Sequence, residues 1–211
     1  MAREAADTKG FAIVNSVNPY RLWGQRSGAW EVCDVLGSAP DWHAIPVGNA
    51  GNISAYWAGY RQYEEMGKIK ALPMMMGFQA AGAAPLVTGE PCPMPETVAT
   101  AIRIGNPVSA HLAKDAVRGS GGEFNSVTDE EILSAQYYLS SKGGIFAEPA
   151  SCAPLAGLLK LKRQGRLPKD IKVVMVLTGN GLKDPDTAMS QVGRPIEIGD
   201  SLDELLEVMK G

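Results

Sequence analysis

The apolar run Trp42–His43–Ala44–Ile45–Pro46–Val47 leads directly into the turn sequence Gly48–Asn49–Ala50–Gly51–Asn52. Such a run is typical of a buried β-strand. The residues that follow, 53–66, carry apolar groups at helical spacing. The sequence therefore predicts a strand, a glycine-rich turn and a helix in direct succession.

A glycine-rich turn between a strand and a helix is suited to anion binding. Glycine lets successive N–H groups converge, and the helix N-terminus adds unpaired donors with a partial positive charge. Asn49 and Asn52 contribute side-chain amides and tolerate left-handed backbone angles. We therefore predict a phosphate pocket at 48–52. The alternative is an ordinary strand-to-helix turn, because one such turn is a weak signal by itself.

The composition is that of a globular protein with enough residues for a sizeable core. Of the 211 residues, 45% are apolar and 20% are charged, and the formal net charge is −3. With this charge and no basic stripe, we expect no nucleic-acid partner. The apolar runs are too short to span a bilayer and the first residues lack an apolar signal-peptide core, so we expect no membrane partner.

Cysteine and histidine usage argues against a disulfide framework and against a metal centre. Cys33, Cys92 and Cys152 are odd in number, widely spaced and outside any Cys-x-x-Cys pair. This usage fits a reducing cytoplasm. His43 and His111 lie far apart in the sequence, so we expect no bound metal.

Strand and helix patterns alternate along the chain. Continuous apolar runs separated by helices predict an α/β fold with a mostly parallel sheet covered by helices on both faces. Residues 80–95 are rich in glycine and proline and predict a surface loop. The expected strands are 11–14, 42–47, 74–78, 144–147 and 173–177, and the expected helices are 24–36, 53–66, 128–139 (with a capping box at Thr128 and Glu131), 154–163 and 202–209, with a further helix start at 96–104.

Three polar turns follow predicted strands and should meet at one edge of the sheet, where ligands of parallel sheets bind. They are Gly48–Asn52, Glu148–Ser151 and Thr178–Gly181. The Thr178 hydroxyl could face the nitrogen of a heterocycle that stays neutral, whereas a carboxylate there would favour its protonation. Taken alone, Thr178 could equally close a strand and its turn.

Further candidates lie near these turns. Asn15 and Arg21 could supply an amide and a guanidinium for a second phosphate, although an Asn–Pro turn with a surface arginine explains the same residues. We interpret Lys183 as a charged lysine paired with Asp184, because a Schiff-base lysine needs a lowered pKa and a desolvated pocket. Cys152, at a helix start, is interpreted as a small buried residue.

Together these segments resemble the carboxyl-terminal portion of the threonine synthases, pyridoxal-phosphate enzymes of the tryptophan-synthase-β-like fold (fold type II). The resemblance covers nearly the whole chain and thins over about the last twenty residues. Its most specific part combines Gly48–Asn52 with the run Thr178–Gly–Asn–Gly–Leu–Lys–Asp. Segments 79–86, 101–107 and 178–188 also resemble the bacterial enzymes.

The resemblance implies roles for individual residues. Gly48, Asn49, Ala50, Gly51 and Asn52 would hold the phosphate of pyridoxal 5'-phosphate, and Thr178 would face its pyridine nitrogen. Asn15, Arg21 and Asn49 would hold the phosphate of the substrate, O-phospho-L-homoserine. The implied reaction eliminates that phosphate and adds water, which gives L-threonine.

One departure from the family pattern concerns the Schiff base. The longer front part of family members carries a Ser–Phe–Lys–Asp segment with the Schiff-base lysine and a Ser/Thr–Gly–Asn segment that cradles the ring. Neither front-part segment occurs in this sequence, whose one Thr–Gly–Asn is the turn that begins at Thr178. We therefore expect residues 1–211 to form an amino-terminally truncated enzyme, the incomplete large domain without most of the small domain. Such a fragment is expected to be inactive alone and to expose a strand edge.

Two alternatives to a threonine synthase remain open at this stage. The chain could come from another fold type II enzyme, such as a serine/threonine dehydratase, or it could be a non-catalytic anion-binding remnant. Asn15 and Arg21 favour a phosphorylated substrate over the first alternative. A complete enzyme is expected to be a homodimer in the cytoplasm.

Overall fold

The computed structural model describes residues 2–14, 18–192 and 196–210. Within them, one parallel sheet has the strand order β3-β2-β1-β4. The central strand β2 is the longest, and β4, the shortest, lies at an edge beside β1. The strands are β1 (Trp42–Pro46), β2 (Met74–Ala80), β3 (Glu123–Val127) and β4 (Val173–Met175).

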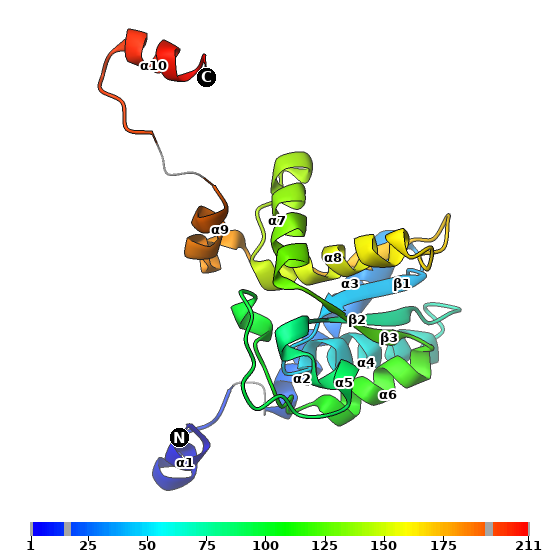
Figure 1. Cartoon of the computed structure of the whole chain (residues 1–211). Helices are drawn as coiled ribbons and strands as arrows, with labels where there is room; N and C mark the ends of the chain where they lie inside the picture. Colours follow the sequence, from blue (N-terminus) through cyan, green and yellow to red (C-terminus); the bar gives the residue numbers. More distant parts are fainter. Residues whose placement is uncertain (1, 15–17, 193–195, 211) are drawn as a thin grey trace.

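Helices cover both faces of the sheet (Figure 1). On one face, α3 (Ser27–Leu36), α4 (Gly51–Glu65) and α6 (Ala110–Ser120) enclose one apolar core. On the other face, α8 (Pro149–Arg163) lies against the strands and α7 (Asp129–Gly143) packs on α8 around a second core. The predicted α/β class with helices on both faces is confirmed.

The continuous apolar pattern of the central strands follows from this arrangement. Ala44 and Met76 point into the core beneath α8, whereas Ile45 and Met75 point into the core beneath α4. Because successive side chains of a strand point to opposite faces, a strand buried on both faces is apolar at most positions. The buried polar residues His43 of β1 and Gln79 of β2 each have a hydrogen-bond partner.

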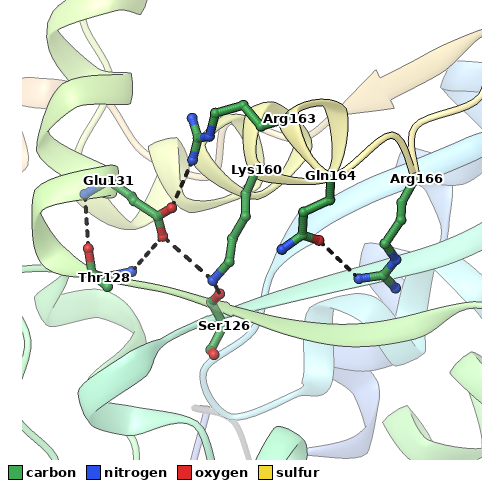
Figure 2. Close-up of polar contacts among 7 residues, drawn as sticks. All are labelled: Ser126, Thr128, Glu131, Lys160, Arg163, Gln164 and Arg166. Carbon is green, nitrogen blue, oxygen red and sulfur yellow. Dashed lines mark hydrogen bonds and ion pairs between the residues drawn. The ribbon is translucent and has the colours of Figure 1, made fainter.

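The start of α7 is tied to α8 and β3 by polar contacts (Figure 2). The capping box predicted at Thr128 is present: the Thr128 N–H donates to Glu131 Oε2 at 3.0 Å, and the Glu131 N–H donates to Thr128 Oγ1 at 3.2 Å. Arg163 Nη2 lies 2.9 Å from Glu131 Oε1, and Lys160 Nζ donates to the Ser126 carbonyl at 2.8 Å. One glutamate thus starts a helix and joins it to its neighbour.

The remaining elements are short. Helices α1 and α10 stand apart from the sheet at the two ends of the chain (Figure 1). These elements are α1 (Ala2–Lys9), α2 (Pro19–Gln25), α5 (Pro85–Thr88), α9 (Pro185–Gln191), α10 (Leu202–Val208) and the 3-10 turns η1 (Ala81–Ala83), η2 (Thr100–Ile102) and η3 (Gly181–Lys183).

Two strand predictions are wrong because the segments have no strand to pair with. Residues 11–14 form no regular element, and Phe11 is 70% exposed and Val14 80% exposed. Residues 144–147 begin with Gly144, the left-handed C-cap of α7, and among them only Ala147 forms an isolated bridge, to Asn180. An apolar tetrapeptide becomes a strand only where a neighbour takes up its backbone hydrogen bonds.

Several helix predictions also need correction. The expected helix 24–36 is two helices, α2 and α3, and 96–104 contains only η2. Helix α8 begins at Pro149, which suits a first helical position, and Pro154 lies inside it. Strand β3 and helix α6 were not predicted.

Candidate functional site

A pocket of about 560 Å³ opens at the carboxyl ends of β1 and β4. Its wall combines segments far apart in the sequence: α2 and α3, the glycine turn with the first residues of α4, the η2 turn, Glu148, and the turn after β4. All three polar turns predicted for this edge contribute to it or contact it, and the volume is in the range of small-molecule sites.

The glycine turn lines this pocket along its whole length, with Gly48, Asn49, Ala50, Gly51 and Asn52 all in the wall. A Cβ on Gly48 would lie 3.0 Å from the Ala101 carbonyl oxygen, so a side chain there would force the turn or its neighbour to shift by a few tenths of an ångström. Ala50, the N-cap of α4, has φ +65° and no side-chain acceptor for the first-turn N–H groups. An anion can therefore take the place of a capping side chain.

The turn after β4 and the first turn of α8 bring two hydroxyl groups together. Ser151 Oγ and Thr178 Oγ1 lie 3.1 Å apart, and the Gly179 N–H donates to Ser151 Oγ at 2.9 Å. Thr178 itself lines the pocket and is exposed to it. The structure thus places the predicted Thr178 in the same pocket as the glycine turn.

Lys183 is paired, as predicted, but with a different residue. Its Nζ lies 3.4 Å from Glu148 Oε2, and its side chain is 60% exposed. Asp184, the expected partner, instead caps α9 by accepting from the Thr187 N–H at 3.3 Å. Lys183 is the last residue of η3, and it lines the pocket together with Glu148.

Of the residues predicted for a second phosphate, two line the pocket. Arg21 lies there on α2, whose N-cap Asn18 accepts from the Tyr20 N–H at 2.9 Å. Asn49 lines the pocket from the glycine turn, and its carbonyl accepts from the Ser109 N–H at 3.1 Å. Asn15 lies outside the described residues.

The sequence analysis missed Tyr56, which lines the pocket from α4. Burial and the charge of Glu31, another wall residue, raise the pKa of Tyr56. The signal was available in the helical spacing, because Tyr56 lies little more than one turn beyond Gly51 and Asn52. The contribution of Glu31 on α3 depends on how that helix packs, and no local pattern marks it.

Behind Tyr56 lies a buried histidine. The rings of Tyr56 and His43 are 4.5 Å apart, and His43 Nδ1 lies 2.9 Å from the Tyr60 hydroxyl. Within the described residues, His43 Nε2 has no hydrogen-bond partner. Burial lowers the pKa of His43 from 6.5 to about 3, so this imidazole is neutral and part of the core.

The cysteines near the site are not nucleophiles. Cys152 is fully buried, and burial together with the charge of Glu148 raises its thiol pKa to about 12. Burial and Asp34 raise the pKa of Cys33 to about 11. The interpretation of Cys152 as a small buried residue is confirmed, because a thiol kept protonated does not attack.

Among the described residues, no three histidine, cysteine, aspartate or glutamate side chains gather in a way that could hold a metal ion. No described helix combines the length and apolar character needed to cross a membrane.

A comparison with protein families gives the class of this chain. The model of the family described as pyridoxal-phosphate dependent enzyme matches residues 1–179. The chain belongs to this family of pyridoxal-phosphate-dependent enzymes, of fold type II.

Within this class, the chain is similar to curated proteins that are named threonine synthase. The chain is 57% identical over 197 residues to the threonine synthase of Synechocystis sp., a match that covers 93% of this chain and 51% of the relative. It is 51% identical over 212 residues to the threonine synthase of Halalkalibacterium halodurans, with 100% of this chain and 60% of the relative covered. The chain thus spans little more than half the length of these relatives.

Solved structures share the fold at low sequence identity. Maize serine racemase superposes with a TM-score of 0.72 at 16% identity, over 90% of this chain and 59% of that one. Threonine deaminase isoform 2 of Solanum lycopersicum gives 0.70 at 16% identity, over 98% and 51%. At this identity the likeness concerns the fold alone.

Proposed function

We propose that this chain is the part of a threonine synthase that binds the cofactor phosphate and the pyridine nitrogen. The observation that carries the proposal is one pocket that unites the glycine turn, Thr178 and Arg21. A phosphorylated pyridine fits its donors: the uncapped start of α4 suits a phosphate, and the Thr178 hydroxyl suits a ring nitrogen. The cofactor supplies an electron sink when it is bound.

In this proposal, the residues of the pocket divide between cofactor and substrate. Gly48, Asn49, Ala50, Gly51 and Asn52 hold the cofactor phosphate through backbone N–H groups and amides. Arg21 and Asn49 orient the phosphate of O-phospho-L-homoserine, with Asn15 as a third ligand. A guanidinium binds a phosphate through two parallel hydrogen bonds, so Arg21 fixes the direction of the leaving group as well as its charge.

For the complete enzyme we propose cleavage of the carbon–oxygen bond that holds the phosphate of O-phospho-L-homoserine. Addition of water then gives L-threonine. The Schiff-base lysine would come from a segment outside residues 1–211, in line with the share of the relatives that this chain spans. Lys183 is a poor substitute, since it is paired with Glu148 and largely exposed. We propose a homodimer for the complete enzyme and, from the three free cysteines, a cytoplasmic location.

The test uses the purified chain and the variant Arg21→Ala. Pyridoxal phosphate and phosphohomoserine are titrated by calorimetry, and phosphate release is measured with both present. We expect R21A to weaken phosphohomoserine binding about tenfold and cofactor binding by less than about twofold, because one charged hydrogen-bonded pair is lost. Arg61→Ala is the control, because Arg61 is exposed on α4 and pairs with Glu65 outside the pocket.

Three results would contradict the proposal. Equal losses for both ligands in R21A would remove the assignment of Arg21 to the substrate. Turnover near that of an intact enzyme, or a borohydride-trapped cofactor on Lys183, would show that the chain carries its own Schiff-base lysine.

A second candidate is an interaction module, and the edge position of β4 favours it. β4 pairs with β1, and within the described residues no strand pairs with its other side. The chain could therefore add a strand from a separately encoded front half. Co-purification with the front half of a threonine synthase, with recovered phosphate release, would support this candidate.

A further inference from the structure

A carboxylate lies in the wall of the proposed cofactor pocket, and its environment is unusual for an acidic residue. Glu148 is 5% exposed and is the N-cap of α8, yet its side chain does not cap that helix. A buried carboxylate is unfavourable unless partners satisfy it. Its partners therefore show why it is there.

Both oxygens of this carboxylate are taken by residues of the turn after β4. Thr178 Oγ1 donates to Oε1 at 3.3 Å, and Lys183 Nζ lies 3.4 Å from Oε2. A Cβ on Gly179 would lie 2.3 Å from Oε1, so the carboxylate packs directly against that glycine. The backbone adds a further bond, from the Glu148 N–H to the Gly179 carbonyl at 3.1 Å.

We propose that Glu148 is a positioning residue that sets the direction of the Thr178 hydroxyl at the pocket wall, with Lys183 holding the carboxylate in place. The proposal rests on the proposed function for one point, that Thr178 faces the ring nitrogen of pyridoxal phosphate. It assigns a role to the Glu148–Lys183 pair, which the cofactor and substrate roles above leave without one.

The hydroxyl network explains why a positioning residue is needed. Ser151 Oγ accepts from the Gly179 N–H, and its own hydrogen can go to Thr178 Oγ1 or to the Gly179 carbonyl, 3.4 Å away. A threonine hydroxyl has one hydrogen and can accept two hydrogen bonds. Without the Glu148 carboxylate, the Thr178 hydroxyl would keep its hydrogen bond to Ser151 Oγ. That bond does not fix its direction, because either oxygen can donate, so the Thr178 hydroxyl could rotate freely.

Lys183 allows the same hydroxyl to serve a ligand. When Thr178 turns its hydrogen toward a ring nitrogen, Glu148 loses one hydrogen bond. The ammonium group still neutralises the carboxylate, so the loss does not leave an unpaired buried charge. In Lys183→Met the carboxylate would lose this neutralising charge. The Thr178 hydroxyl should then donate more firmly to Glu148, and its contact to the ring nitrogen should weaken.

The first experiment needs no ligand. The Thr178 methyl group is labelled with 13C, and its χ1 rotamer is measured from three-bond couplings in the wild-type chain and in Glu148→Gln and Glu148→Ala. We expect one rotamer in the wild type and in E148Q, whose amide keeps the shape, and averaging in E148A. Glu65→Ala, an exposed acidic residue of α4, is the control. An unchanged single rotamer in E148A would overturn the proposal.

The second experiment compares two probes, pyridoxal phosphate and inorganic phosphate, by calorimetry. E148A and Lys183→Met should weaken pyridoxal phosphate about tenfold and inorganic phosphate by less than about twofold, because one charged network at the ring end is lost. With ring-15N cofactor, the nitrogen shift should move in both variants. A general structural defect would instead weaken both probes equally, and that result would contradict the positioning role.

The two experiments separate this inference from the proposed function. Averaging of Thr178 in E148A together with no binding of pyridoxal phosphate to the wild type would contradict the proposed function and still support the role of Glu148. If the wild type binds pyridoxal phosphate and E148A binds it with equal affinity, the result would support the proposed function and contradict the role of Glu148.

Discussion

The two turns that form the pocket, after β1 and after β4, are built in different ways. Gly48–Asn52 follows a central strand buried on both faces, and its shape comes from backbone angles and the start of a long helix. Residues 178–183 follow an edge strand and are mostly exposed, and their shape comes from side chains of α8.

This difference teaches how each half of the pocket responds to change. The first turn cannot adopt another conformation, because the core fixes the strand before it and the helix after it. A small change in the space around its backbone should therefore alter anion binding directly. The second turn depends on a buried carboxylate, and its geometry should follow Glu148. The predictions below test this contrast, beginning with the largest expected effect.

The strand that carries the first turn should weaken in acid because of His43. Its pKa is lowered to about 3 in the folded chain and is near 6.5 when unfolded, so between these values only the unfolded state gains the proton. Stability should therefore fall as the pH drops, by about 1.6 kcal/mol between pH 6.5 and pH 5. Urea unfolding at pH 6.5 and 5 measures this. His43→Phe should lose most of the slope, and His111→Gln, at an exposed site, should keep it.

The second turn should lose its shape when Gly179 gains a methyl group. The new Cβ would overlap the Glu148 carboxylate, which is buried and cannot move without leaving Thr178 and Lys183. We expect Gly179→Ala to destabilise the chain by about 1–2 kcal/mol in urea unfolding. Gly143→Ala, where the Cβ would meet only Leu139 at 3.5 Å, is the control. Equal stability of the two variants would refute the packing argument.

Anion binding at the first turn should respond to one methyl group on Gly48. Its Cβ would lie 3.0 Å from the Ala101 carbonyl oxygen and 3.1 Å from Ile102 Cα, so the turn must shift by a few tenths of an ångström. We expect Gly48→Ala to weaken inorganic phosphate about tenfold in calorimetry. Gly24→Ala has open space around the new group and should bind as the wild type does. Unchanged binding in G48A would place the anion elsewhere.

The smallest expected effect is a gain in stability at Ala50. This alanine has φ +65°, a left-handed angle that glycine adopts without steric strain. Ala50→Gly should stabilise the chain by about 0.5 kcal/mol, the relief of strain less the added entropy of the unfolded chain. Ala58→Gly, inside α4, should instead lose about 1 kcal/mol. Thermal unfolding of both variants would show whether the signs differ.

Sequence patterns predicted those elements whose signal is local. The run at 42–47 and the helix after Gly51 agree with β1 and α4, and Thr128 with Glu131 marks the start of α7. In these places the apolar period and the cap are set by neighbouring residues. Strand β3 escaped notice because Glu123–Val127 mixes polar and apolar residues, and it forms by pairing with β2.

The false strands show the same limit from the other side. Residues 11–14 and 144–147 have the composition of strands, but neither segment pairs with a strand of the sheet. The same limit applies to the site. The residues proposed for the cofactor were predictable from the sequence of their turns, whereas Tyr56 and Glu31 line the pocket because of how their helices pack.

The sequence by itself determined the glycine turn, its strand and its helix, because backbone freedom at glycine and apolar periodicity are local properties. It also determined the class of chemistry through the resemblance that Thr178 and its turn support. Only the tertiary structure decided that Lys183 pairs with Glu148 rather than with Asp184, and that this carboxylate faces Thr178. Those contacts join α8 to the end of β4, and no pattern within either segment encodes the distance between them.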